Sequence, residues 1–186
     1  HFIECLEKGV EAFGWDASMP RPASRREGNW LIGQGVAGAY RGSPVMPSGA
    51  RVRLQPDGRL IVETDMTDIG TGSYTILGQT AAEMMGVALD AVEVRLGDSS
   101  YPVSAGSGGQ FGAVSATGGV YAACVALREA VARRIGSAPE NVDFREGLVT
   151  DGNVSHTLAE VASEGEIVAE DKIEFGEFRS KEYELA

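Results

Sequence analysis

Cysteine and histidine are scarce in this sequence, which holds two of each in 186 residues. Two cysteines are too few for a disulfide framework, for a zinc site or for holding an iron–sulfur cluster within this chain. Cys5 and Cys124 both lie in apolar helical patterns, which predicts buried thiols. His156 follows a turn without a matching serine and aspartate, so we interpret it as a surface residue. The sequence therefore supplies no metal ligands that we would name.

Basic residues and long apolar runs are also few. Sixteen Lys and Arg stand against 27 Asp and Glu, a net charge of −11, which argues against nucleic acid because its phosphates are bound through basic side chains. The acidic excess is concentrated in residues 160–184, so the middle of the chain could still accept a phosphorylated small molecule. No apolar run approaches the roughly 18–20 residues that cross a bilayer, and residues 1–14 lack an export signal. We therefore expect neither a membrane nor a nucleic-acid partner.

The spacing of apolar residues predicts an α+β fold, a mixed sheet with packed helices. The clearest local signal is a β-hairpin of residues 50–54 and 60–64, joined at Gln55–Gly58 by a Pro-Asp-Gly turn. A helical leader and proline-marked linker over residues 1–27 would precede a domain over residues 28–186. The other expected elements are helices over 1–13 (packed on a core), 73–85, 113–135 and 158–162, and strands over 30–41, 92–96, 142–145, 148–150 and 167–175.

Two glycine-rich loops, residues 68–73 and 104–113, each lead into the start of an expected helix. Such loops bind anions, since glycine lets a ligand approach backbone N–H groups that point along the positive end of the helix. The same loops also occur as turns without a ligand, in which case the chain would be a non-catalytic interaction domain. Asp65 and Asp68, beside the first loop, are more simply turn-forming residues than cation ligands.

Residues 59–96 allow a third interpretation, a nucleotide-binding module of the Rossmann type. They give strand, Gly70-Thr71-Gly72, helix and strand, but Thr75 stands where the fingerprint needs a third small residue. Antiparallel pairing of the two strands would exclude this interpretation.

The order of several motifs resembles one stretch of the large subunit of the xanthine dehydrogenase and aldehyde oxidase family of molybdenum hydroxylases. The match covers about residues 28–186, and its most specific parts are residues 67–75, 79–83, 94–99 and the second glycine loop with residues 120–124 that follow. The bacterial periplasmic aldehyde oxidoreductases are the most similar branch. The resemblance implies a lobe of the cofactor-binding region, with molybdopterin cytosine dinucleotide and molybdenum as the cofactor.

By this resemblance, residues of both loops would contact the cofactor. Thr71 replaces the glutamine usual in the family, and its hydroxyl reaches less far than an amide. The family's catalytic glutamate lies in a motif that this sequence does not contain, and Glu63, Glu83 and Glu93 read as solvent-facing charges, so we name no catalytic residue. The expected cofactor-binding residues are Ile69, Gly70, Thr71, Gly109, Gln110, Phe111, Gly112 and Ala113.

The resemblance also implies the surroundings of the site. Iron–sulfur clusters and FAD would reside on two partner subunits, and the substrate would be an aldehyde or an N-heterocycle. The enzyme would be bacterial, in the cytoplasm or periplasm. The sequence begins with His1 and ends without a turn or cap, so we expect both ends to be cuts within a longer protein, and we expect no turnover by this chain alone.

Overall fold

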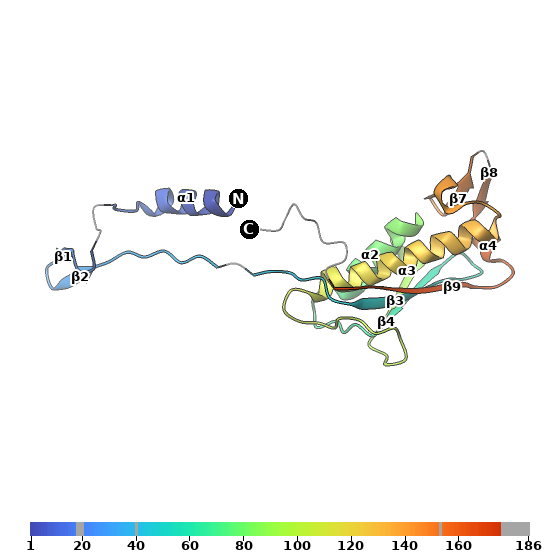
Figure 1. Ribbon diagram of the computed structural model, residues 1–186, viewed down its shortest axis with the longest axis horizontal. Helices are drawn as coiled ribbons and strands as arrows, with labels where there is room; N and C mark the ends of the chain where they lie inside the picture. Colours follow the sequence, from blue (N-terminus) through green and yellow to red (C-terminus); the bar gives the residue numbers. More distant parts are fainter. Residues whose placement is uncertain (18–20, 40, 153, 176–186) are drawn as a thin grey trace. The chain divides into compact units, whose positions relative to one another are not determined.

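The computed structural model describes residues 1–17, 21–39, 41–152 and 154–175 (Figure 1). Parts of the expected linker, of the strand over 30–41 and of the acidic tail lie outside these residues. The chain divides into two compact units, residues 1–41 and 42–186. The domain boundary expected after residue 27 stays a prediction.

The first unit contains helix α1 (Phe2–Phe13) and a hairpin of β1 (Arg25–Glu27) and β2 (Trp30–Ile32). Gly14 ends α1 in the left-handed conformation, with φ of 71°. The helix is confirmed, but none of its residues is buried and Cys5 is exposed. The buried thiol predicted at Cys5 is therefore wrong, whereas the packing of this helix on a core stays a prediction, because an amphipathic pattern specifies a helix but not its partner.

The strand expected over residues 30–41 is shorter than predicted, since among its described residues (30–39 and 41) only Trp30–Ile32 pairs with another strand. Glycines at 33, 35 and 38 follow. Glycine weakens a strand because it offers no side chain for packing.

A four-stranded mixed sheet forms the centre of the second unit, in the order β5-β4-β3-β9. Its strands are β3 (Ser48–Leu54), β4 (Leu60–Thr64), β5 (Val92–Leu96) and β9 (Ile167–Ile173). β3 pairs antiparallel with β4 and with β9, whereas β4 and β5 are parallel. The predicted hairpin, its turn and the α+β class are confirmed.

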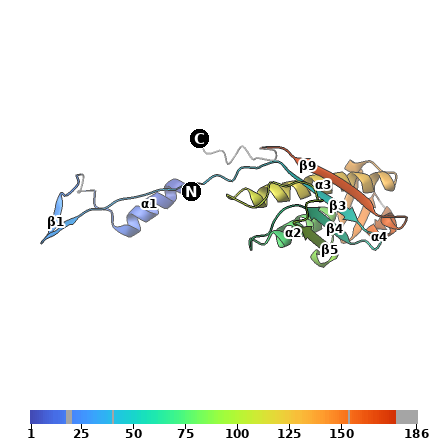
Figure 2. The ribbon, with the colours of Figure 1, turned by 90° about the horizontal axis from the view of Figure 1, so that it is seen from below.

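Helices α2 (Ser73–Met85) and α3 (Gly112–Arg134) pack on one face of this sheet (Figures 1 and 2). The side chains of Val52, Leu54 and Val62 on the sheet and of Leu127 on α3 are fully buried between the layers. α3 approaches β3 closely, because a Cβ at Gly119 would lie 2.7 Å from the Ser48 carbonyl oxygen. Both helices were predicted within one residue of their observed bounds.

A smaller antiparallel sheet of β6 (Val142–Arg145), β7 (Leu148–Asp151) and β8 (Val154–Thr157) follows α3, and helix α4 (Leu158–Ala162) follows β8. Short 3₁₀ turns, η1 (Leu89–Ala91) and η2 (Pro139–Asn141), precede β5 and β6. β8 was not predicted, since its four residues show no buried position. Cys124 on α3 is buried as predicted, and burial raises the pKa of its thiol to about 12.

The opposite face of the central sheet carries a charge cluster centred on Glu63. Its carboxylate Oε2 lies 3.1 Å from Arg51 Nη1 and 3.0 Å from Arg53 Nε, and Arg95 is 3.7 Å from Oε1. Only 5% of the Glu63 side chain is exposed. The solvent-facing position predicted for Glu63 is therefore wrong, because long arginine side chains from two neighbouring strands cover it, while Glu83 and Glu93 are exposed as predicted.

We expect Glu63→Gln to lower the free energy of unfolding by about 2 kcal/mol, because the substitution leaves half-buried guanidinium groups without their shared charge. Urea denaturation measures this loss. Glu93→Gln is the matched control, since Glu93 also pairs with Arg95 but is exposed, and such pairs contribute at most about 1 kcal/mol. Equal losses in the two variants would show that the cluster does not depend on a buried Glu63.

Candidate functional site

Two loops leave the same edge of the central sheet. β4 ends at Thr64 and continues into the first loop, residues 65–72, and β5 ends at Leu96 and continues into the second loop, residues 97–111. Thr64 and Leu96 are register partners in the parallel pair. Because parallel neighbouring strands end at the same edge, the two loops begin side by side at the carboxyl ends of the strands, the usual ligand position in parallel sheets.

The first loop is folded around the side chain of Asp68. Its Oδ1 accepts hydrogen bonds from the N–H groups of Gly70 (2.7 Å) and Thr71 (3.0 Å), and its Oδ2 accepts from Tyr74 at 3.4 Å. Gly70 and Gly72 have φ of 91° and 79°, which glycine adopts without strain. Asp68 is therefore a turn-forming residue, as the sequence favoured.

The second loop ends at a helix start that has no side-chain cap. Gln110 has φ of 69°, an uncommon conformation for a residue with a side chain. The first helical hydrogen bond of α3 runs from the Ser115 N–H to the Phe111 carbonyl at 3.0 Å. The N–H groups of Gly112, Ala113 and Val114 come before this bond, so they have no i−4 carbonyl within the helix.

Side chains fasten the two loops to each other. Asp65 Oδ1 accepts from the Ser104 N–H at 2.6 Å, and the Ser107 hydroxyl donates to the Thr67 carbonyl. A Cβ at Gly112 would lie 2.9 Å from the Gly106 carbonyl oxygen and 3.1 Å from Met66 Cε. The glycine at 112 is therefore required by close packing between the loops.

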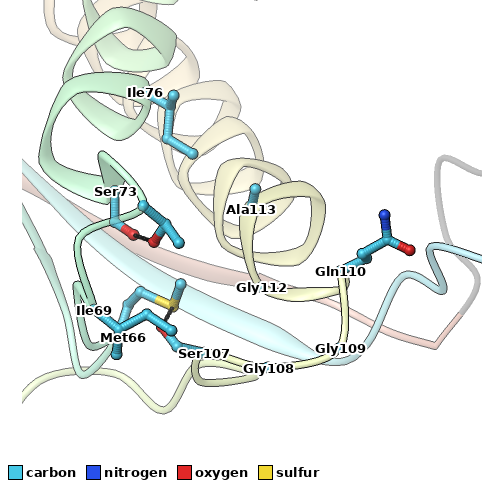
Figure 3. Close-up of a pocket in the computed structure, with 11 residues that line it drawn as sticks. Met66, Ile69, Ser73, Ile76, Ser107, Gly108, Gly109, Gln110, Gly112 and Ala113 are labelled. Atoms are coloured by element: carbon cyan, nitrogen blue, oxygen red, sulfur yellow. Dashed lines mark hydrogen bonds between the residues drawn. The ribbon is translucent and has the colours of Figure 1, made fainter.

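A pocket of about 320 Å³ lies between the loops and the first turns of α2 and α3 (Figure 3). This volume is at the low end of the range for ligand pockets. The lining residues are small, apolar or hydroxyl-bearing, and none is charged: Met66, Ile69, Thr71, Ser73, Ile76, Ser107, Gly108, Gly109, Gln110, Gly112 and Ala113. Figure 3 shows Ile76 on α2 and Ala113 on α3. The Ser107 hydroxyl oxygen lies 3.9 Å from the Met66 sulfur.

Most of the residues predicted from the sequence meet at this pocket. Ile69, Thr71, Gly109, Gln110, Gly112 and Ala113 line it, whereas Gly70 and Phe111 do not. The Gly70 N–H binds Asp68, and the Phe111 ring lies against Gly108, since a Cβ there would be 3.0 Å from Phe111 Cζ. Both residues thus shape the loops, and their contact with a cofactor stays a prediction.

Five lining residues are absent from the list of expected cofactor-binding residues: Met66, Ser73, Ile76, Ser107 and Gly108. Ser73 lies in the first glycine loop recognised in the sequence, and its hydroxyl could add a hydrogen bond to a ligand there. Ser107 and Gly108 belong to the recognised glycine loop and could have been included. Ile76 follows a helical apolar pattern that fits a core position equally well, and Met66 carried no separate signal.

In the described part of the chain, no three His, Cys, Asp or Glu side chains come together in a way that could hold a metal ion. The same residues contain no helix with the length and apolarity needed to span a bilayer.

The sequence matches the family model described as the molybdopterin cofactor-binding domain over residues 8–184. The match covers almost the whole chain. This chain belongs to the molybdopterin cofactor-binding domain family. The family membership and the fold stated above as a resemblance are thereby confirmed.

Relatives of known name agree with this family. The chain is 56% identical over 182 residues to the aldehyde oxidoreductase molybdenum-binding subunit PaoC of Escherichia coli, covering 98% of this chain and 25% of the relative. It is 35% identical over 96 residues to the putative xanthine dehydrogenase molybdenum-binding subunit XdhA of E. coli K12, covering 49% of this chain and 13% of the relative. The chain thus spans about a quarter of the length of the first of these relatives.

Solved structures of related enzymes have the same fold. Quinoline 2-oxidoreductase from Pseudomonas putida 86 matches with a TM-score of 0.57 and 21% identity, over 69% of this chain and 19% of the other. The CO dehydrogenase of Oligotropha carboxidovorans also gives 0.57, at 15% identity over 70% of this chain and 19% of the other.

The family decides between the alternatives left open by the sequence. β4, α2 and β5 do form a parallel strand–helix–strand unit, so the strand pairing does not exclude a Rossmann module. However, β3 and β9 continue the same sheet antiparallel, and the family model is that of a molybdopterin-binding domain. The interaction domain and the Rossmann module are therefore both set aside.

We expect the charge of Asp68 to stabilise the fold in a pH-dependent way. Hydrogen bonds from backbone N–H groups, that of Gly70 foremost, hold the pKa of Asp68 below its ordinary value of 3.8. A lowered pKa contributes stability that is present above this value and is lost as the pH falls through the folded-state pKa. Wild type should therefore exceed Asp68→Asn in free energy of unfolding at about pH 6, and this difference should shrink below about pH 4.

Denaturant unfolding of both proteins across this pH range measures the difference. Asp57→Asn serves as a control, because Asp57 Oδ1 accepts a hydrogen bond from one backbone N–H, that of Arg59 at 3.1 Å, whereas Asp68 accepts from three. A difference for Asp68→Asn that is constant down to about pH 2 would contradict the role assigned to the carboxylate.

Proposed function

We propose that this chain forms part of the cofactor-binding subunit of a bacterial molybdenum oxidoreductase, and that the pocket between its two loops holds part of molybdopterin cytosine dinucleotide. The observation that carries the proposal is the meeting of both glycine loops at one uncharged pocket, in a chain of the molybdopterin-binding family. Ile69, Thr71, Gly109, Gln110, Gly112 and Ala113 would contact the cofactor.

The residues present fit such a group. A Cβ placed at Gly70, Gly72 or Gly106 would meet no atom within 4 Å, so open space lies over the loop backbone. The amides at the start of α3, which have no i−4 carbonyl within the helix, supply donors for phosphate oxygens, and the hydroxyls of Thr71 and Ser73 supply donors for pterin oxygens. The Ser107 hydroxyl already donates to the Thr67 carbonyl. The pocket volume suits one moiety of a dinucleotide, and other parts of the cofactor would need further contacts.

The proposed reaction is the oxidation of an aldehyde, with hydroxylation of an N-heterocycle as the second candidate. The 56% identity over 98% of this chain to a molybdenum-binding subunit named for aldehyde oxidation supports the first, whereas the xanthine dehydrogenase relative matches about half of the chain at 35%. When bound, the cofactor supplies the redox chemistry, and the protein orients it and excludes water. No residue of this chain is proposed as the catalytic base.

We propose further that the enzyme works with an iron–sulfur subunit and an FAD subunit, in the cytoplasm or periplasm. The relatives are named as molybdenum-binding subunits, which supports partner subunits in general. The scarcity of cysteine supports electron-transfer centres outside this chain.

We expect Ala113→Trp and Thr71→Trp each to reduce the cofactor bound by the purified enzyme at least about tenfold, because an indole would fill the pocket from the α3 side or the first loop. Molybdenum content and the fluorescence of the oxidised pterin measure the bound cofactor. Glu129→Trp is the matched control, since Glu129 is a half-exposed residue on α3 outside the pocket, and it should keep the full content.

Cofactor content equal to wild type in both pocket variants, with circular dichroism unchanged, would mean that the loops are structural turns. Loss of cofactor in Glu129→Trp as well would show that tryptophan on α3 disturbs folding and not the pocket.

A further inference from the structure

The two loops at the pocket differ in whether their backbone amides are already bound. In the first loop, the Asp68 carboxylate binds the amides of Gly70, Thr71 and Tyr74 at 2.7, 3.0 and 3.4 Å. A carboxylate held in this way occupies the position that a phosphate oxygen would take at the start of α2. The α2 end is thus filled by an anion that belongs to the chain itself.

The second loop carries no such internal anion. The start of α3 has no side-chain cap and no acidic residue in its first turn. The amides of Gly112 and Ala113 precede the first helical hydrogen bond, and both residues line the pocket. Only this side of the pocket combines backbone donors with the absence of a local negative charge.

The charge of Asp68 opposes a second anion in the same place. Two like charges within hydrogen-bonding distance of the same amides repel each other strongly. No lysine or arginine lines the pocket to offset the repulsion. The side of the pocket formed by the first loop offers instead the apolar Ile69 and Ile76 and the hydroxyls of Thr71 and Ser73.

We propose that Asp68 is a positioning and specificity-determining residue, which closes the first loop to phosphate and leaves anionic groups of the ligand only the amides at the start of α3. The inference rests on the proposed function for the identity of the ligand. The closure of the first loop does not depend on that identity, since it applies to any phosphate.

The test is a titration of the full chain with inorganic phosphate, at constant ionic strength, followed by the backbone amide signals in two-dimensional ¹⁵N NMR. In wild type, the Gly70 and Thr71 signals should not shift. In Asp68→Ala, whose amides are released, both signals should shift and saturate as phosphate binds. Asp98→Ala is the matched control, because Asp98 makes a similar turn with Ser100 at 2.8 Å in an exposed loop, and its removal should leave Gly70 and Thr71 unshifted.

Two outcomes would overturn the proposal. A saturating shift of Gly70 and Thr71 in wild type would mean that Asp68 does not exclude phosphate. The absence of a shift in the folded Asp68→Ala variant would mean that the first loop was never an anion site for Asp68 to close. If the alanine variant does not fold, Asp68→Ser takes its place with the same two criteria.

The titration separates this proposal from the proposed function. It needs no cofactor, so full molybdenum content in the tryptophan variants of Ala113 and Thr71 would refute the cofactor site and leave the result for Asp68 unchanged. Conversely, a phosphate shift in the wild-type first loop would refute the role of Asp68 without affecting the cofactor measurement.

Discussion

The parallel pairing of β4 with β5 is the constraint on which the site depends. A parallel pair requires a crossover, here made by α2, and it aligns the ends of both strands at one sheet edge. Each glycine loop starts at one of these ends, so the pairing brings two segments that are more than 30 residues apart in sequence to one pocket. The contacts of Asp65 with Ser104 and of Ser107 with Thr67 then fix the loops together.

The central sheet has two chemically different faces, and the residues that stabilise them are not the residues that line the pocket. One face buries aliphatic side chains under α2 and α3, and the other holds Glu63 among arginines of neighbouring strands. Because the charged cluster joins β3, β4 and β9 through Arg51 and its second partner Glu170, it ties the edge strand to the hairpin. None of the residues in these ion pairs lines the pocket, whose lining is uncharged.

The pocket combines two helix starts with different electrostatics. At α2 the Asp68 carboxylate lies at the positive end of the helix, whereas at α3 the residues that carry the first amides, Gly112 and Ala113, line the pocket without a side-chain cap. Similar glycine-rich sequences thus give two environments, one suited to neutral groups and one to an anion. Under the proposed function, a cofactor that joins a ring system to phosphates would use both kinds of surface.

The sequence by itself determined the elements with strong local signals. The hairpin at Gln55–Gly58, the bounds of α2 and α3 and the α+β class follow from turn chemistry and helical periodicity. The six expected residues that line the pocket follow from the resemblance to the family. The tertiary structure alone decided that Glu63 is covered by arginines and that Met66 and Ile76 reach the pocket. It also decided that the Asp68 carboxylate binds the backbone amides of Gly70, Thr71 and Tyr74. The physical reason is that periodicity and turn residues act over a few neighbours along the chain, whereas burial and charge pairing depend on which strands become neighbours in the sheet.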